Sequence, residues 1–133
     1  MITIIVDAII IKDKKILLVQ RSEKEDECGK WSFPGGVANR GELKKDALLR
    51  ELREELKIEA KNIRFFQEYS MKSNGNTIKA FYYLCDFSEK SLKLNNELSN
   101  YGWFPIDERI LDFNFAFNQK LVAQDLLNSQ FLY

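Results

Sequence analysis

Histidine is absent from this sequence of 133 residues, and cysteine and proline occur only twice each. The lack of histidine excludes catalytic triads and metal sites that depend on an imidazole. The two cysteines, Cys28 and Cys85, form no CxxC motif, so they predict reduced thiols and a cytoplasmic location, not a disulfide framework. An excess of one charge is also missing, because 20 basic residues balance 20 acidic ones. This balance gives no support to nucleic-acid or anionic-membrane binding.

A long hydrophobic run is absent as well. The apolar segment Ile2–Ile11 (ITIIVDAIII) has only ten residues and is interrupted by Asp7, whereas a membrane-spanning helix needs about 20 residues. The N-terminus also lacks the basic region and cleavage site of a secretory signal. We therefore expect a buried strand at Ile2–Ile11 and no membrane association.

The remaining composition, 45% hydrophobic and 30% charged, predicts one soluble globular domain over residues 1–133. Strand and helix patterns mix without regular alternation, which predicts an α+β fold with a mixed sheet and helices packed on it. The first two strands are expected to form a hairpin, and the sequence SNGN predicts a turn between the third and fourth. The expected strands are Ile2–Ile11, Ile16–Arg21, Ile63–Ser70, Thr77–Phe87 and Tyr101–Ile106, and the expected helices are Glu42–Lys57 and Phe115–Phe131.

The segment RELREELKI crowds three carboxylates onto one side of the first predicted helix. Glu51, Glu54 and Glu55 fall within an arc of about 100° on a helical wheel. Like charges at this spacing destabilise a helix by a few tenths of a kcal/mol per pair. A divalent cation would offset this repulsion, because Mg²⁺ and Mn²⁺ prefer carboxylate oxygens. The segment alone also fits an ordinary solvated helix with Arg/Glu pairs.

The glycine-rich stretch PGGVANRGE, just before this helix, favours a ligand site. Glycines let backbone amides and carbonyls approach an ion or a phosphate closely. With the helix it forms a segment, Gly36–Ile58, that resembles the Nudix box, G-x5-E-x7-R-E-U-x-E-E-x-G-U, where U is bulky and aliphatic. Lys57 replaces the second glycine, where a left-handed helix end would cost about 1 kcal/mol. The matching positions are Gly36, Glu42, Arg50, Glu51, Leu52, Glu54, Glu55 and Ile58.

The resemblance implies a Nudix hydrolase that cleaves nucleoside diphosphates linked to another group, with an α/β/α sandwich around a mixed sheet. It implies that Glu54 and Glu55 bind Mg²⁺ or Mn²⁺, and that Glu51 is a ligand, the general base, or both. The Gly35 carbonyl would complete the metal shell. This assignment agrees with the chemistry, because a pyrophosphate repels nucleophiles until its charge is neutralised, and a carboxylate can then accept the proton.

Five further residues are candidates around this centre. By resemblance, Glu42 supports the site, Arg50 holds the catalytic carboxylates through ion pairs, and Gly36 contacts the substrate. Glu97 is either a further ligand or base, or a solvated loop glutamate. Arg21 either contacts a phosphate or simply ends a surface strand.

The substrate class is less defined by the sequence. Nudix hydrolases of ADP-ribose often have a proline shortly after the box, but no proline lies between Pro34 and Pro105 here. Gly75 and Asn76 stand where dinucleoside polyphosphate hydrolases often have a tyrosine. The markers of two Nudix subclasses are therefore missing. Nucleoside triphosphates on one side, and ADP-ribose or NDP-sugars on the other, both stay open as candidate substrates.

The segment LDFNFAFNQKLV lies where Nudix proteins often build a base pocket. Phe113, Phe115 and Phe117 would stack on a base and Asn118 would read its edge. The alternative places the three phenylalanines in the core and Asn118 at the start of the last helix.

The resemblance leaves two functions open. One is a metal-dependent nucleotide pyrophosphohydrolase, with a small-molecule nucleotide as its partner. The other is a catalytically inactive Nudix-fold sensor that binds nucleotides. The complete set of box carboxylates favours the enzyme. A homodimer is a further expectation, because Nudix proteins are often dimers.

Overall fold

The computed structural model describes residues 1–88 and 92–129. Within these ranges, no helix is long and apolar enough to cross a membrane. In chain order, the elements are β1 (Ile2–Ile9), β2 (Ile11–Lys12), β3 (Lys15–Arg21), β4 (Trp31–Ser32), β5 (Gly35–Val37), α1 (Lys44–Leu56), β6 (Glu59–Ser73), β7 (Asn76–Ser88), β8 (Leu98–Pro105), the 3₁₀ helix η1 (Glu108–Asp112) and α2 (Gln119–Leu127).

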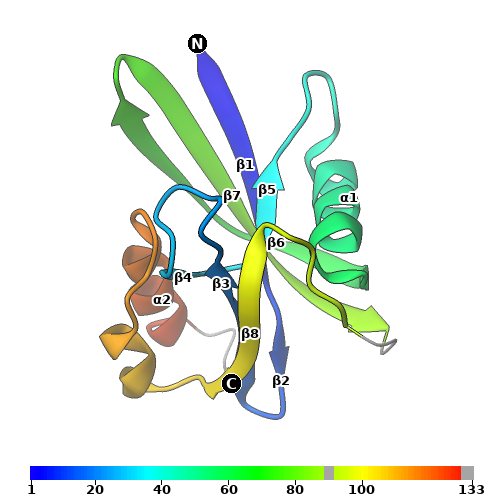
Figure 1. The fold of residues 1–133 in the computed structure, drawn as a ribbon, viewed down its shortest axis with the longest axis vertical. Helices are drawn as coiled ribbons and strands as arrows, with labels where there is room; N and C mark the ends of the chain where they lie inside the picture. The colour runs from blue at the N-terminus through cyan, green and yellow to red at the C-terminus, as the bar shows by residue number, and fades with distance from the viewer. Residues whose placement is uncertain (89–91, 130–133) are drawn as a thin grey trace.

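The strands form two four-stranded sheets, and α1 and α2 flank them on opposite sides (Figure 1). In the first sheet the strand order is β5-β1-β7-β6, with β1 and β7 parallel and the other pairs antiparallel. In the second sheet β3 pairs with β2, β4 and β8, all antiparallel. The predicted α+β class with a mixed sheet is confirmed.

The predicted hairpin between Ile2–Ile11 and Ile16–Arg21 is only partly correct. Its tip exists, since Ile11 pairs with Ile16. The longer part of the segment, β1, instead lies in the other sheet between β5 and β7. A parallel pairing between residues 75 positions apart, such as Ile2 and Thr77, has no local sequence signal, because both strands are simply apolar runs.

The later elements were predicted with less accurate bounds. The β6–β7 hairpin is longer than expected at both ends, and its turn has positive φ at Asn74 and Gly75, as a tight two-residue hairpin requires. The second helix begins at Gln119 rather than Phe115, and Phe131 lies outside the described residues. The short helix η1 was not predicted.

The alternating side chains of β1 divide the core in two. Val6 and Ala8 belong to the cluster that includes the buried leucines of α1. Ile9 belongs to the cluster that includes the buried face of α2, and Ile5 packs against that cluster. Asp7 shares the α2-facing side of the strand with these two isoleucines, so a carboxyl group interrupts an otherwise apolar surface.

Candidate active site

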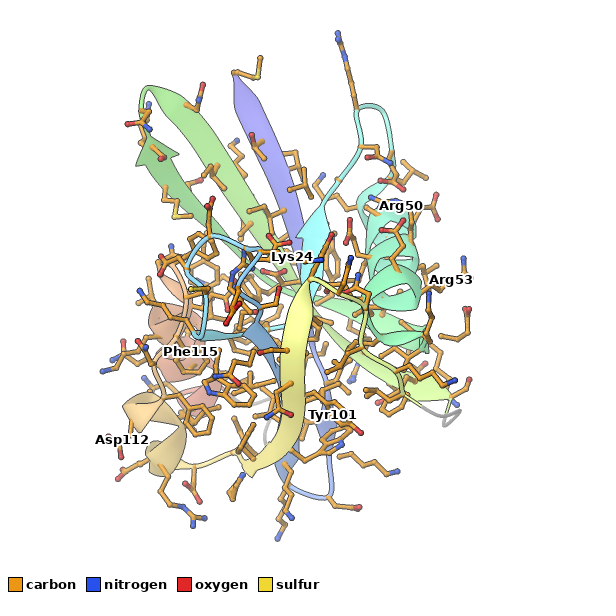
Figure 2. All side chains as sticks on the ribbon, in the orientation of Figure 1. Lys24, Arg50, Arg53, Tyr101, Asp112 and Phe115 are labelled. Atoms are coloured by element: carbon orange, nitrogen blue, oxygen red, sulfur yellow. The ribbon has the colours of Figure 1, made fainter. Side chains whose placement is uncertain are left out.

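Helix α1 carries three carboxylates on the side next to its buried face. Leu48, Leu52 and Leu56 are fully buried and fix the rotation of the helix. Glu55 is then buried as well, with 6% of its surface exposed. The Glu51 side chain is 13% exposed and the Glu54 side chain 55%. Arg53 lies on the outer side of the helix and pairs with Glu59 (Figure 2).

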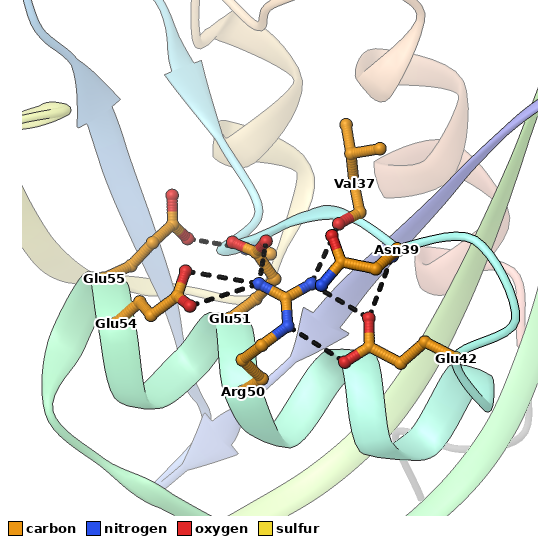
Figure 3. Close-up of polar contacts among 8 residues, drawn as sticks. Val37, Asn39, Glu42, Arg50, Glu51, Glu54 and Glu55 are labelled. Carbon is orange, nitrogen blue, oxygen red and sulfur yellow. Dashed lines mark hydrogen bonds and ion pairs between the residues drawn. The ribbon is translucent and has the colours of Figure 1, made fainter.

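Arg50 lies among the carboxylates and contacts several of them (Figure 3). Its Nε donates to Glu42 Oε2 at 2.9 Å, and its Nη1 donates to Glu51 Oε1 at 2.9 Å and Glu54 Oε1 at 3.2 Å. Its Nη2 donates to the Val37 carbonyl at 3.1 Å. One guanidinium therefore ties the helix to the loop that precedes it and partly neutralises the carboxylates.

Two glycines of β5 approach the helix closely. The Gly35 N–H donates to Glu55 Oε1 at 2.9 Å. A Cβ at Gly35, where φ is 155°, would lie 2.1 Å from the Val6 carbonyl oxygen. A Cβ at Gly36 would lie 2.3 Å from Glu51 Oε2. Only glycine fits this approach without displacing the strand or the carboxylate.

The two glycines and the three α1 carboxylates line one cavity of about 420 Å³, a size typical of small-molecule sites, whereas Arg50 and Glu42 are not among its lining residues. The α1 carboxylates form part of its wall, and residues of β1, β7 and the start of α2 form another part. The cavity therefore brings together charged residues and apolar surface from distant segments. The lining residues expected from the sequence are Arg21, Gly35, Gly36, Glu51, Glu54, Glu55, Glu97, Phe117 and Asn118.

The cavity carboxylates have too little positive charge nearby to neutralise them. Burial raises the pKa of Glu55 well above its ordinary value, and the charges of Glu51, Asp7 and Glu97 raise it further. Burial also raises the pKa of Glu51, although Arg50 opposes this shift. A cation in the cavity would relieve this unfavourable charge.

The donor set fits a hard divalent cation in its chemistry. Glu51, Glu54 and Glu55 offer only carboxylate oxygens, which Mg²⁺ and Mn²⁺ prefer. Within residues 1–88 and 92–129, no group of three acidic or thiol side chains has already converged to hold an ion. Glu54 is the most exposed of the three, so it has the most freedom to turn toward a cation. Its pair with Arg50 is also exposed and can be exchanged for the cation.

Replacing Arg50 with methionine should destabilise the metal-free protein by about 1–2 kcal/mol, because Glu42 and Glu51 lose their ion-pair partner. Urea unfolding in EDTA measures the change. The matched control is Arg53→Met on the same helix, whose pair with Glu59 is exposed and should therefore contribute much less to stability, because solvent screens it. Equal losses in the two variants would contradict the role given to Arg50.

The family model of the NUDIX domain matches residues 1–126, nearly the whole chain. The chain belongs to the Nudix family.

Named relatives and a solved Nudix-like structure agree with this assignment. A CTP pyrophosphohydrolase of Escherichia coli (strain K12) is 43% identical over 74 residues, which are 56% of this chain and 55% of that protein. The chain thus aligns with about half the length of this relative. The nucleoside triphosphatase NudI of Escherichia fergusonii is 31% identical over 111 residues, 74% of this chain and 79% of that protein. The solution structure of the E. coli ORF135 protein has a TM-score of 0.84 and 31% identity, covering 96% of this chain and 89% of that one.

The Nudix helix ends at Lys57 in the left-handed conformation, with φ 59° and ψ 32°. Its N–H donates to the Arg53 carbonyl at 3.1 Å, and the next N–H donates to the Leu52 carbonyl at 3.4 Å. The lysine therefore adopts the backbone conformation for which the Nudix box has a glycine. The substitution affects the end of the helix and removes no carboxylate from the cavity.

The phenylalanines proposed for base stacking have different locations. Phe115 is buried, and Phe113 packs edge-on against Trp31 and Phe104. Phe113 and Phe115 therefore belong to the core, as the alternative to base stacking predicted. Phe117 is exposed at the cavity with a positive φ of 53°.

The other candidates from outside the Nudix box also reach the cavity. Asn118 takes the N-cap position of α2, where its side chain makes no capping hydrogen bond. The Arg21 guanidinium lies over the Phe117 ring at 5.1 Å, and its Nε donates to the Asp26 carbonyl. Glu97 is exposed in the loop that hydrogen-bonds the end of α1 through Asn95. The catalytic and binding roles of these residues stay predictions.

Sequence reasoning missed three buried polar residues at the same cavity. Asp7 comes from β1, Tyr82 from β7 and Gln119 from the first turn of α2. Asp7 had a detectable signal, because a charged residue inside an apolar strand is unusual and needs an explanation. Tyr82 and Gln119 had none, since tyrosine is common in strands and glutamine in helices.

Asp7 should make the metal-free protein less stable as the pH rises. Burial raises its pKa from 3.8 to about 8. Between these two values the folded state binds a proton that the unfolded state has lost, so the free energy of unfolding falls as pH increases from about 4 to about 8. Calorimetry in EDTA should show Asp7→Asn gaining stability relative to the native protein across this interval. If the free energies of unfolding of the two proteins changed in parallel with pH, the raised pKa of Asp7 would be contradicted.

Proposed function

We propose that this protein is a divalent-metal-dependent pyrophosphohydrolase that converts nucleoside triphosphates to nucleoside monophosphates and pyrophosphate. The observation that carries the proposal is the single cavity that joins the α1 carboxylates to an apolar surface beyond β1. A triphosphate needs the carboxylates, which can hold a metal ion, and a nucleoside needs the apolar surface. The printed activities of two relatives, a CTP pyrophosphohydrolase and a nucleoside triphosphatase, support this substrate class.

The residues of the cavity suit the steps of this reaction. When bound, Mg²⁺ or Mn²⁺ supplies positive charge for the phosphate oxygens and makes a water molecule more acidic. Glu51, Glu54 and Glu55 would hold this ion. The raised pKa of Glu51 suits a general base that takes a proton from the attacking water. The oxygen of this water joins one of the two phosphorus atoms of the α–β bridge, and that bridge breaks to give the nucleoside monophosphate and pyrophosphate.

The neighbouring residues would position the reacting groups. Arg50 holds Glu51 at 2.9 Å, and Glu42 holds Arg50 from the other side. Arg21 brings a positive charge to the same cavity, where it would contact a phosphate. Glu97 lies close enough to raise the pKa of Glu51 and Glu55, so it is a candidate for a second base or ligand.

The test is hydrolysis of a substrate panel. It contains ordinary and oxidised nucleoside triphosphates, ADP-ribose, NDP-sugars and dinucleoside polyphosphates, each with Mg²⁺, with Mn²⁺ and with EDTA. The proposal predicts turnover of triphosphates that EDTA abolishes. Turnover confined to ADP-ribose or NDP-sugars would contradict the substrate class. Nucleotide binding without turnover of any compound would favour the inactive sensor.

A further inference from the structure

Three buried polar side chains meet at the α2-facing part of the cavity, and the proposed hydrolysis uses none of them. Asp7, Tyr82 and Gln119 are exposed over 4%, 1% and 6% of their surfaces, yet all three line the cavity. Burying a carboxyl, a phenol and a carboxamide is costly unless each is hydrogen-bonded. Their position beside an open cavity indicates a surface that recognises a ligand.

The three side chains form a connected, preorganised network. The Tyr82 phenol lies close enough to Asp7 to oppose the rise in the pKa of that carboxyl, and Gln119 Nε2 donates to Asp7 Oδ2 at 3.5 Å. Gln119 Oε1 accepts the Phe33 N–H at 2.9 Å, which orients the amide so that its Nε2 faces Asp7. A carboxyl group has about four acceptor positions, so these two partners leave acceptor capacity at Asp7 for a ligand.

Apolar side chains surround this polar network. They come from β1, β6, β7 and the segment before β5, and they are Ile5, Phe33, Met71, Ile78 and Ala80. A polar group at the base of an apolar slot matches a nucleobase, whose faces are apolar and whose edge carries hydrogen-bonding groups. The α1 carboxylates line the same cavity, so a base in this slot would place its phosphates toward them.

We propose that Asp7 determines base specificity by accepting a hydrogen bond from an exocyclic amino group of the substrate base. Cytosine and uracil give the clearest comparison, because they have nearly the same size. Cytosine has an amino group at C4, whereas uracil has a carbonyl oxygen there, and that oxygen would face the oxygens of Asp7. Bases with the amino group are therefore favoured. This assignment rests on the proposed function, since it concerns the base of the same substrate.

The experiment compares cytidine and uridine nucleotides on three proteins. In EDTA and above pH 8, where Asp7 is ionised and its oxygens can only accept, calorimetry should give CMP a dissociation constant about 10-fold or more below that of UMP for the native protein. In Asp7→Ala the ratio should fall to within about 2-fold, because no acceptor remains. In Asp7→Asn it should also fall to within about 2-fold or reverse, because the new amide can donate to the uracil oxygen.

Kinetics with Mg²⁺ give a second readout. The CTP preference over UTP should appear in KM and should disappear in both Asp7 variants, with kcat little changed. Met71→Leu, which alters an apolar wall of the slot, is the matched control and should keep the native ratio. If Asp7→Ala does not fold, the isosteric Asp7→Asn decides the question alone.

Two results would overturn the assignment. One is a native protein that binds CMP and UMP equally. The other is an unchanged ratio in Asp7→Asn, with equal losses for both nucleotides, as a purely structural role would give. Monophosphate binding in EDTA needs no turnover, so failure of all hydrolysis would remove the proposed function without removing a CMP preference that depends on Asp7.

Discussion

Replacing Glu54 with glutamine should lower kcat/KM for nucleoside triphosphate hydrolysis by about 100-fold or more. Glu54 is the most exposed of the three α1 carboxylates, and its contacts with Arg50 are 3.2 and 3.3 Å long. Its loss therefore costs the fold little, while the cavity loses the carboxylate best placed to turn toward a cation. Initial rates over a range of Mg²⁺ concentrations measure the effect, which should include a higher Mg²⁺ requirement.

The matched control for this variant is Asp46→Asn. Asp46 is on the same helix, is exposed and does not line the cavity. The substitution removes the same charge and should leave kcat/KM within about 2-fold of the native value, with a stability loss of about 0.5 kcal/mol from the helix N-terminus. Similar activity in Glu54→Gln and Asp46→Asn would exclude Glu54 as a metal ligand.

Replacing Gly35 with alanine should destabilise the protein by about 3 kcal/mol and lower its melting temperature by about 10 °C. The new Cβ would lie 2.1 Å from the Val6 carbonyl oxygen and 2.3 Å from Asp7 Oδ1. Backbone cannot yield as a flexible side chain can, so the β1–β5 pairing must shift. The Gly35 N–H would then move from Glu55, and activity should fall with stability.

Gly75→Ala is the control, because it measures the cost of a positive φ where the added Cβ overlaps no other atom. Gly75 has φ 79° in the β6–β7 turn, and a Cβ there would meet no atom within 4 Å. Its expected cost is about 1 kcal/mol, with activity retained. Differential scanning calorimetry of both variants measures the difference. A Gly35→Ala protein as stable as Gly75→Ala would contradict the close approach of β5 to β1.

The parts of the fold with local signals could be predicted from the sequence. The α1 leucines repeat at helical spacing, and the Asn74–Gly75 pair requires a tight turn. The partner of β1 could not be predicted, because its parallel pairing with β7 joins residues far apart in sequence. The start of α2 was misplaced because Phe115 is held in the core by packing before the helix begins.

The part of the candidate site that lies on one helix could be predicted, because the spacing of its residues in the sequence fixes their positions. Glu51, Glu54 and Glu55 share a helix face by geometry alone, so their common cavity wall follows from the sequence. The opposite wall depends on three elements that meet only in the folded chain. Asp7 and Gln119, 112 residues apart, are within 3.5 Å there, and no local pattern shows such a contact.

The ³¹P NMR spectrum of CTP during incubation with the protein and Mg²⁺ shows directly which phosphate bond is cleaved. We expect signals of CMP and pyrophosphate to grow in equal amounts, with no change when EDTA is present. Formation of CDP and inorganic phosphate, or product formation that continues in EDTA, would contradict this expectation.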